Sequence, residues 1–131
     1  MYEFHGWIGI AETAEESDAG NLPALLQELC LFVADISWQT ATLDLNYLNG
    51  QPFLRMDGLV NRMRDEARKV EAIYAFVADR LPGSYGLLYE RADDMPTPPG
   101  PGGFRVGILA RGRLRYDLDP FLSPCHPIIE D

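Results

Sequence analysis

The first segment of the chain alternates between two sets of side chains, as a strand with one buried face does. Residues 2–11 place four large apolar residues on one face of the expected strand: Tyr2, Phe4, Ile8 and Ile10. The other face carries His5 and Trp7. This pattern predicts a strand that covers a core on one side only.

Two later segments repeat their apolar residues at the spacing of a helix. The first begins near Asn21, a good cap, and its stripe is Leu22, Leu25, Leu26, Leu29, Phe32, Val33 and Ile36. The second covers 63–81 with a stripe of Met63, Ala67, Val70, Tyr74, Val77 and Leu81, and Pro82-Gly83 ends it. We therefore expect two amphipathic helices.

Four further strands are expected from apolar runs bounded by turn residues. Strands over 41–48 and 52–60 are joined by Asn49-Gly50, the strongest short hairpin signal. Strands over 84–91 and 104–111 flank a loop rich in proline and glycine, and a short segment at 114–118 follows. The order β-α-β-β-α-β-β predicts an α+β fold, an antiparallel-rich sheet with both helices on one face, akin to the ferredoxin-like arrangement.

The last thirteen residues, 119–131, predict a C-terminal proline-rich strap. Pro120, Pro124 and Pro127 exclude a helix or a central strand. The segment is nevertheless too apolar for a disordered tail, since it contains Phe121, Leu122, Ile128 and Ile129. We expect an extended strap whose apolar side chains dock onto the folded body, with the acidic end in water.

Composition narrows the class of protein. A chain of 131 residues predicts a single domain over 1–131. The formal net charge of -9 would repel nucleic acid and anionic lipid and attract cationic partners. No apolar run approaches the ~20 residues that cross a bilayer, and the first residues lack a signal-peptide pattern, so we expect a cytoplasmic protein with Cys30 and Cys125 reduced.

Candidate chemistry is sparse. The adjacent pair Cys125-His126 would point apart in an extended strap, so the histidine cannot easily serve as base for the thiol. Asp93-Asp94 and the pair Asp117 and Asp119 lack the spacing of a calcium loop, and no glycine-rich phosphate motif occurs. We therefore predict no catalytic residue, no metal and no cofactor.

Three stretches together resemble one family, the immunity protein 7 family of bacterial polymorphic toxin systems. They are Tyr2-Glu-Phe-His-Gly-Trp-Ile8, Pro82-Gly-Ser-Tyr-Gly-Leu-Leu-Tyr-Glu-Arg91, and Phe104-Arg-Val with Leu109-Ala-Arg-Gly112 and Asp119-Pro-Phe-Leu-Ser-Pro-Cys125. The loop before Phe104 is a local elaboration, and Gly107 stands where a large residue is expected. The resemblance implies a non-enzymatic cytosolic antidote that binds and occludes a cognate toxin domain.

Six residues are expected to contact such a toxin. Two lie on the face of the first strand away from the core, and four are aspartates: Trp7, His5, Asp93, Asp94, Asp117 and Asp119. An acidic surface would suit a basic nuclease toxin. Two alternatives stay open. One is a small cytosolic hydrolase or transferase with Cys125 or His5 as its reactive group. The other is an interaction scaffold that forms a weak homodimer through Leu31 and Phe76, the off-stripe helix residues.

Overall fold

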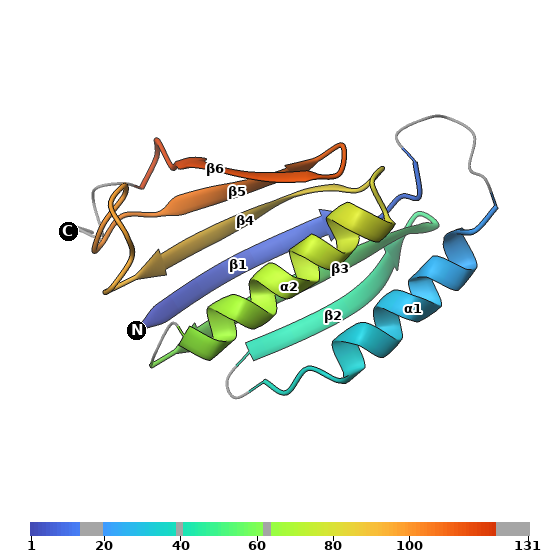
Figure 1. Cartoon of the computed structure of the whole chain (residues 1–131), viewed down its shortest axis with the longest axis horizontal. Helices are drawn as coiled ribbons and strands as arrows, with labels where there is room; N and C mark the ends of the chain where they lie inside the picture. Colours follow the sequence, from blue (N-terminus) through green and yellow to red (C-terminus); the bar gives the residue numbers. More distant parts are fainter. Residues whose placement is uncertain (14–19, 39–40, 62–63, 123–131) are drawn as a thin grey trace.

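The computed structural model describes residues 1–13, 20–38, 41–61 and 64–122, and within these ranges one sheet layer packs against two helices (Figure 1). The elements are β1 (Tyr2–Gly9), α1 (Leu22–Ala34), β2 (Ala41–Leu48), β3 (Gln51–Val60), α2 (Arg64–Arg80), β4 (Tyr85–Ala92), β5 (Arg105–Ala110) and β6 (Arg113–Leu118). The predicted α+β class and element order are confirmed.

The strand order in the described sheet is β2-β3-β1-β4-β5-β6, and every neighbouring pair is antiparallel. The first four strands in this order have the split β-α-β arrangement of ferredoxin-like folds, with β1 between β3 and β4. Strands β5 and β6 then extend the sheet beyond β4. The short segment expected after Gly112 is therefore a full sixth strand.

Two tight hairpins set the register of the outer strands. Asn49 and Gly50 have φ values of 51° and 81°, as the predicted turn between β2 and β3 requires. Arg111 and Gly112 have φ values of 52° and 74° and join β5 to β6 in the same way. Two consecutive positive φ values are typical of a type I′ turn, whose twist matches that of the strands it joins.

The core lies between the helices and one face of the sheet. The apolar face of β1 is buried, as its alternation predicted, and so is most of the described stripe of α2. The buried apolar residues of that helix are Val70, Ile73, Tyr74 and Val77, followed by Leu81. From α1, Leu29 is buried and the rest of the predicted stripe is partly buried against the same core. Met63 lies outside the described residues.

One off-stripe residue of α2 contacts the other helix. Phe76 is partly buried, and its ring stacks on Phe32 of α1 at a centroid distance of 4.6 Å. It therefore joins the two helices, a contact that the helical stripe does not predict because the stripe marks only the face toward the sheet. Leu31 of α1 is 65% exposed.

The motif Pro82-Gly-Ser-Tyr-Gly86 packs against the end of β1. The Ser84 hydroxyl accepts a hydrogen bond from the Ala11 N–H at 3.0 Å. A Cβ atom at Gly86 would lie 2.0 Å from the backbone oxygen of Trp7, and one at Gly83 would lie 2.1 Å from that of Thr13. Both glycines therefore permit a backbone approach that no other residue allows.

The start of the predicted strap differs from expectation. Phe121 is 83% exposed and Leu122 is 54% exposed, so these two side chains do not dock. Instead Asp119 is buried, and its carboxylate accepts a hydrogen bond from the Leu122 N–H at 2.6 Å. The remainder of the strap, residues 123–131 with Cys125 and His126, lies outside the described residues.

No helix in the described part of the chain is both long and apolar enough to cross a membrane.

Candidate functional site

One face of the sheet has no helix over it, and we call it the open face. Both helices lie against the opposite face (Figure 1). The strand register arranges its side chains in rows, because residues paired across antiparallel strands point to the same side. One row is Asp57, His5, Tyr89, Val106 and Asp117; the next is Arg55, Trp7, Leu87, Ile108 and Arg115.

Trp7 and Tyr85 lie together on this face, and we call this pair the aromatic group. The Trp7 ring meets the edge of the Tyr85 ring at a centroid distance of 5.9 Å and an interplanar angle of 82°. Gly9, between Phe53 and Tyr85 in the register, leaves space for the Tyr85 ring, since a Cβ there would lie 2.6 Å from it. Trp7 is 37% and Tyr85 is 42% exposed. These rings are thus held rigidly yet remain accessible.

A charged network crosses three strands beside the aromatic group. The His5 Nδ1 atom lies 2.7 Å from Oδ1 of Asp57, and its Nε2 atom lies 2.7 Å from Oε2 of Glu3. Arg91 donates from Nη2 to Oε1 of Glu3 at 2.6 Å, and its guanidinium lies over the Phe104 ring at 5.5 Å. The network therefore links β3, β1 and β4.

This geometry favours the protonated form of His5. A neutral imidazole has one donor and one acceptor, so it could satisfy only one of the two carboxylates, whereas an imidazolium donates to both. Burial lowers the pKa of His5, but the hydrogen bonds and charges of Glu3 and Asp57 outweigh burial and raise that pKa above its ordinary value.

The same network lowers the pKa of Glu3. Burial acts to raise this pKa, but the hydrogen bonds from His5 and Arg91 outweigh it. The stabilising contribution of His5 is complete below its ordinary pKa of 6.5 and is lost as the pH rises through its raised pKa. The contribution of Glu3 is complete above its ordinary pKa of 4.5 and is lost as the pH falls through its lowered pKa. Both stabilising contributions are therefore complete between pH 4.5 and pH 6.5.

Replacing Glu3 by glutamine is expected to lower the pKa of His5 toward 6.5, because the amide no longer offers a charged acceptor. The measurement is an NMR titration of the His5 ring protons, with His126→Ala as background to remove the second histidine. The control is Glu28→Gln, which removes the partner of Arg80 on the helix layer and should leave the His5 midpoint unchanged. Equal midpoints in the Glu3→Gln variant and its parent would contradict the network.

A cavity of about 340 Å³ adjoins the charged network. Tyr89 lines it from β4, Phe104 from the residue before β5, and Phe121 and Leu122 from the segment after β6. Its polar walls are Glu3, His5 and Asp119. The lining is mostly apolar, so the cavity suits an apolar side chain of a partner better than a free ion.

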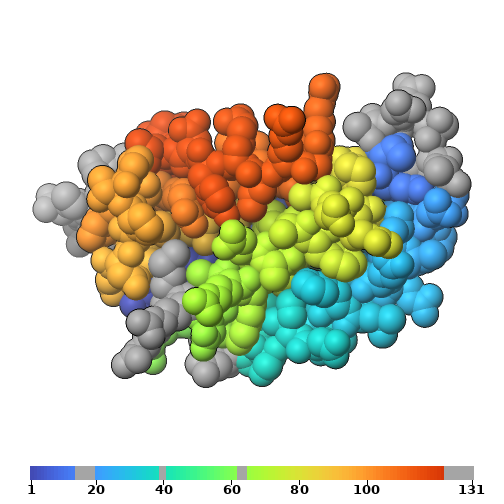
Figure 2. Space-filling view, viewed as in Figure 1, coloured from blue at the N-terminus to red at the C-terminus, as the bar shows by residue number. Residues whose placement is uncertain are grey.

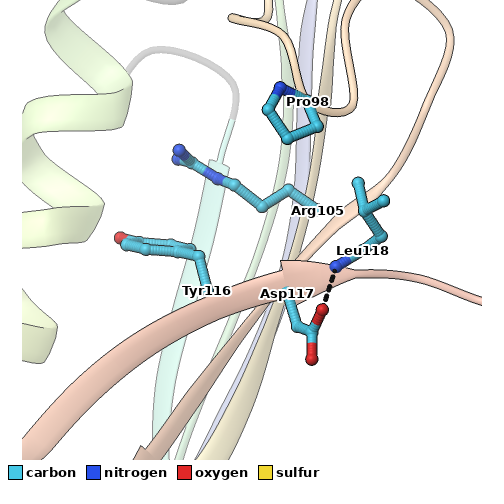
Figure 3. A pocket seen from close by; sticks show the side chains of 5 residues that line it. All are labelled: Pro98, Arg105, Tyr116, Asp117 and Leu118. Atoms are coloured by element: carbon cyan, nitrogen blue, oxygen red, sulfur yellow. Dashed lines mark hydrogen bonds between the residues drawn. The ribbon is translucent and has the colours of Figure 1, made fainter.

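A second, buried network lies on the helix side of the sheet. The Tyr2 hydroxyl donates to the buried Glu90 carboxylate, and Arg105 donates to Oε1 of Glu90 at 2.9 Å. The Arg105 guanidinium stacks on the Tyr116 ring at 4.0 Å, while burial, with the Glu90 charge, raises the pKa of Tyr116 to about 12. Arg105 and Tyr116 also line a cavity of about 240 Å³ together with Pro98, Asp117 and Leu118 (Figure 3).

The structure separates the six predicted contact residues. Trp7 and His5 are neighbours on the open face, and Asp117 lies in the same row as His5. Asp93 lies elsewhere and pairs with the N-terminal amino group at 2.9 Å, and Asp94 is exposed in the turn after β4. Asp119 is buried and holds the turn that follows β6, so it is better assigned to the fold than to a contact surface.

Sequence reasoning missed the partners of His5 and Trp7 on the open face. Glu3 shares the face of His5 at a spacing of two, which the alternation of β1 could have indicated. Asp57, Leu87 and Arg91 become neighbours only through the register of β1 with β3 and β4. Among the described residues, no group of three or more His, Cys, Asp or Glu is placed to hold a metal.

Comparison with known proteins identifies the family. A model of the immunity protein 7 family matches residues 1–131. No curated protein and no solved structure matches the chain significantly. The match confirms the resemblance carried by the β1 segment, the β4 and β5 segments and residues 119–125. The chain therefore belongs to the immunity protein 7 family, and so is an immunity protein of toxin systems.

Proposed function

We propose that the chain is a cytoplasmic, single-domain binding protein that neutralises a cognate toxin domain by docking it on the open face. Family membership supplies the class of partner, since an immunity protein acts on a toxin. The observation that carries the location is the aromatic group around Trp7. Exposed tryptophan and tyrosine held on a rigid sheet are the side chains that dominate protein interfaces.

Charge supports a cationic toxin as the partner. The chain has a formal net charge of -9, which would accelerate the approach of a basic protein. On the open face, by contrast, His5 and Arg91 offset the charges of Glu3 and Asp57. The net charge of the whole molecule would therefore attract the toxin, and the aromatic group would supply the binding contacts once the toxin has docked. An acidic binding protein of this kind favours a basic nuclease as the toxin, blocked at its phosphate-binding site.

The test is co-expression with the toxin domain encoded next to this chain. We expect cells to survive only when the immunity protein is present, and the purified partners to form a complex that calorimetry detects. A toxin domain from an unrelated pair serves as the control and should remain toxic. Undiminished toxicity beside abundant soluble protein, with no complex on a sizing column, would refute the proposal for that pair.

A further inference from the structure

Strand β6 is the last strand of the described sheet, and α2 contacts it on the helix side. It is last in the strand order, so one side of its backbone has no neighbouring strand in the described structure. Figure 2 shows the helix side, where α2 crosses the middle and the red β6 segment stands beside it. Both edge strands reach the core, β2 through Leu43 and Leu45 and β6 through Leu114.

The hairpin determines which backbone groups of β6 point outward. In a two-residue turn the closing pair, here Ala110 and Arg113, exchanges both hydrogen bonds, and the bonded pairs then alternate. Arg115 therefore also bonds to β5, while Leu114 and Tyr116 direct their N–H groups outward. Leu118 follows the same pattern, and its outward N–H is already bound by Oδ1 of Asp117 at 2.9 Å (Figure 3). The edge available for pairing is thus Leu114 to Tyr116.

The two sides of this edge differ in chemistry. The helix side carries Tyr116, 39% exposed, and Leu118, 48% exposed, beside the cavity of about 240 Å³. The open side carries Arg113, Arg115 and, at its far end, Asp117. Both arginines are exposed, as is Arg111 in the turn, and within the described structure none of the three forms an ion pair. Positive charge is therefore concentrated here in a chain whose net charge is -9.

We propose that β6 pairs with an extended segment of the cognate toxin in which acidic and apolar residues alternate. Successive residues of a strand point to opposite sides, so such a segment would place its acidic residues beside Arg113 and Arg115. Its apolar residues would cover Tyr116 and Leu118 and fill the cavity. This mode of recognition, in which a strand is added to a sheet edge, takes affinity from the main chain and specificity from the side chains.

The proposal rests on the proposed function and extends the same interface. Arg115 shares a row with Trp7, separated by Leu87 and Ile108, so three strand spacings, about 14 Å, lie between them. A toxin domain seated on Trp7 therefore reaches the β6 edge without a second contact surface. A toxin that is basic as a whole can still carry one acidic and apolar strand.

Charge disfavours a second copy of the chain as the occupant. Antiparallel pairing of two β6 edges would bring the arginines of one copy close to those of the other, and like charges across strands are destabilising. We therefore expect the free protein to sediment as a monomer. A dimer lost in the Arg113→Glu/Arg115→Glu variant would show that a second copy occupies the edge and would overturn the proposal.

The decisive measurement is amide hydrogen exchange of the full chain, free and bound to its cognate toxin domain. We expect the amides of Leu114 and Tyr116 to exchange at least tenfold more slowly in the complex, because they gain acceptors from the added strand. We also expect Arg113→Glu/Arg115→Glu to weaken binding at least tenfold at low salt, with a smaller loss at high salt. The matched control is Arg68→Glu on the exposed side of α2.

The outcomes distinguish this proposal from the proposed function. If the toxin domain does not bind at all, the proposed function fails. If it binds and is neutralised while the Leu114 and Tyr116 amides exchange as in the free protein, only the strand pairing is refuted. The strand pairing would likewise be refuted if Arg113→Glu/Arg115→Glu lost no more affinity than Arg68→Glu and the Leu114 and Tyr116 amides exchanged as in the free protein.

Discussion

Replacing Trp7 by alanine is expected to weaken toxin binding by about thirtyfold or more, equivalent to about 2 kcal/mol. Trp7 is the largest side chain of the aromatic group on the open face and is only 37% exposed before binding. Its ring is already oriented by the edge contact with Tyr85, so little side-chain freedom remains to be lost on binding. The measurement is calorimetric titration with the cognate toxin domain, supported by the survival of cells that express both proteins.

A stability measurement separates a binding effect from a folding effect. The variant loses the Trp7–Tyr85 ring contact, which contributes about 1 kcal/mol, so its melting temperature should fall by only a few degrees. The control is Leu31→Ala, which removes a more exposed apolar side chain from α1 in the helix layer. It should bind the toxin as the parent does. If Leu31→Ala weakens binding and Trp7→Ala does not, the toxin docks on the helix layer and the open face is the wrong surface.

Replacing Gly86 by alanine is expected to lower the free energy of unfolding by about 3 kcal/mol or more. The added Cβ would lie 2.0 Å from the backbone oxygen of Trp7 and 2.9 Å from the Cα of Ile8. Both atoms belong to the backbone of β1, the strand that pairs with β4, so no side chain can rotate away. The two central strands would have to separate. Thermal unfolding followed by circular dichroism should show the melting temperature falling by about 10 °C.

Gly107→Ala is the matched control in the neighbouring strand. The nearest atoms to its added Cβ would be side-chain atoms, 3.2 Å away on Leu114 and 3.3 Å away on Leu88 and Tyr116. These can shift by a few tenths of an ångström, so we expect a loss of about 1 kcal/mol or less. Equal losses in the two variants would show that β1 and β4 can separate at little cost.

The secondary structure was largely predictable because its signals are local. Asn49-Gly50 specified a hairpin by its tolerance of positive φ, and the stripes of both helices pointed to the core as their spacing indicated. The Arg111-Gly112 turn gave a weaker signal, since arginine is not a residue that favours positive φ. For that reason β6 was expected only as a short segment. The exposure of Phe121 and Leu122 was also mispredicted, because apolar character alone does not show that a docking surface exists nearby.

The candidate site was predictable only in part. The alternation of β1 placed His5 and Trp7 on the face away from the core, and the structure confirms that placement. The four aspartates were chosen for charge, which cannot distinguish the buried Asp119 from the exposed Asp94. The two carboxylates that bind His5 differ in their distance from it along the sequence. Glu3 is two residues away in the sequence, whereas Asp57 is 52 residues away and reaches His5 only through strand pairing.

By itself the sequence determined the element order, the core-facing side of β1 and of both helices, and membership of the immunity protein 7 family, because these follow from short-range patterns and from motifs along the whole chain. Only the tertiary structure decided that His5 lies between the carboxylates of Glu3 and Asp57, that Asp119 is buried, and that β6 forms an edge. Each of these depends on which strands are neighbours and in what register. Strands pair through backbone hydrogen bonds, which every residue can form, so the sequence does not by itself show which distant strands become neighbours.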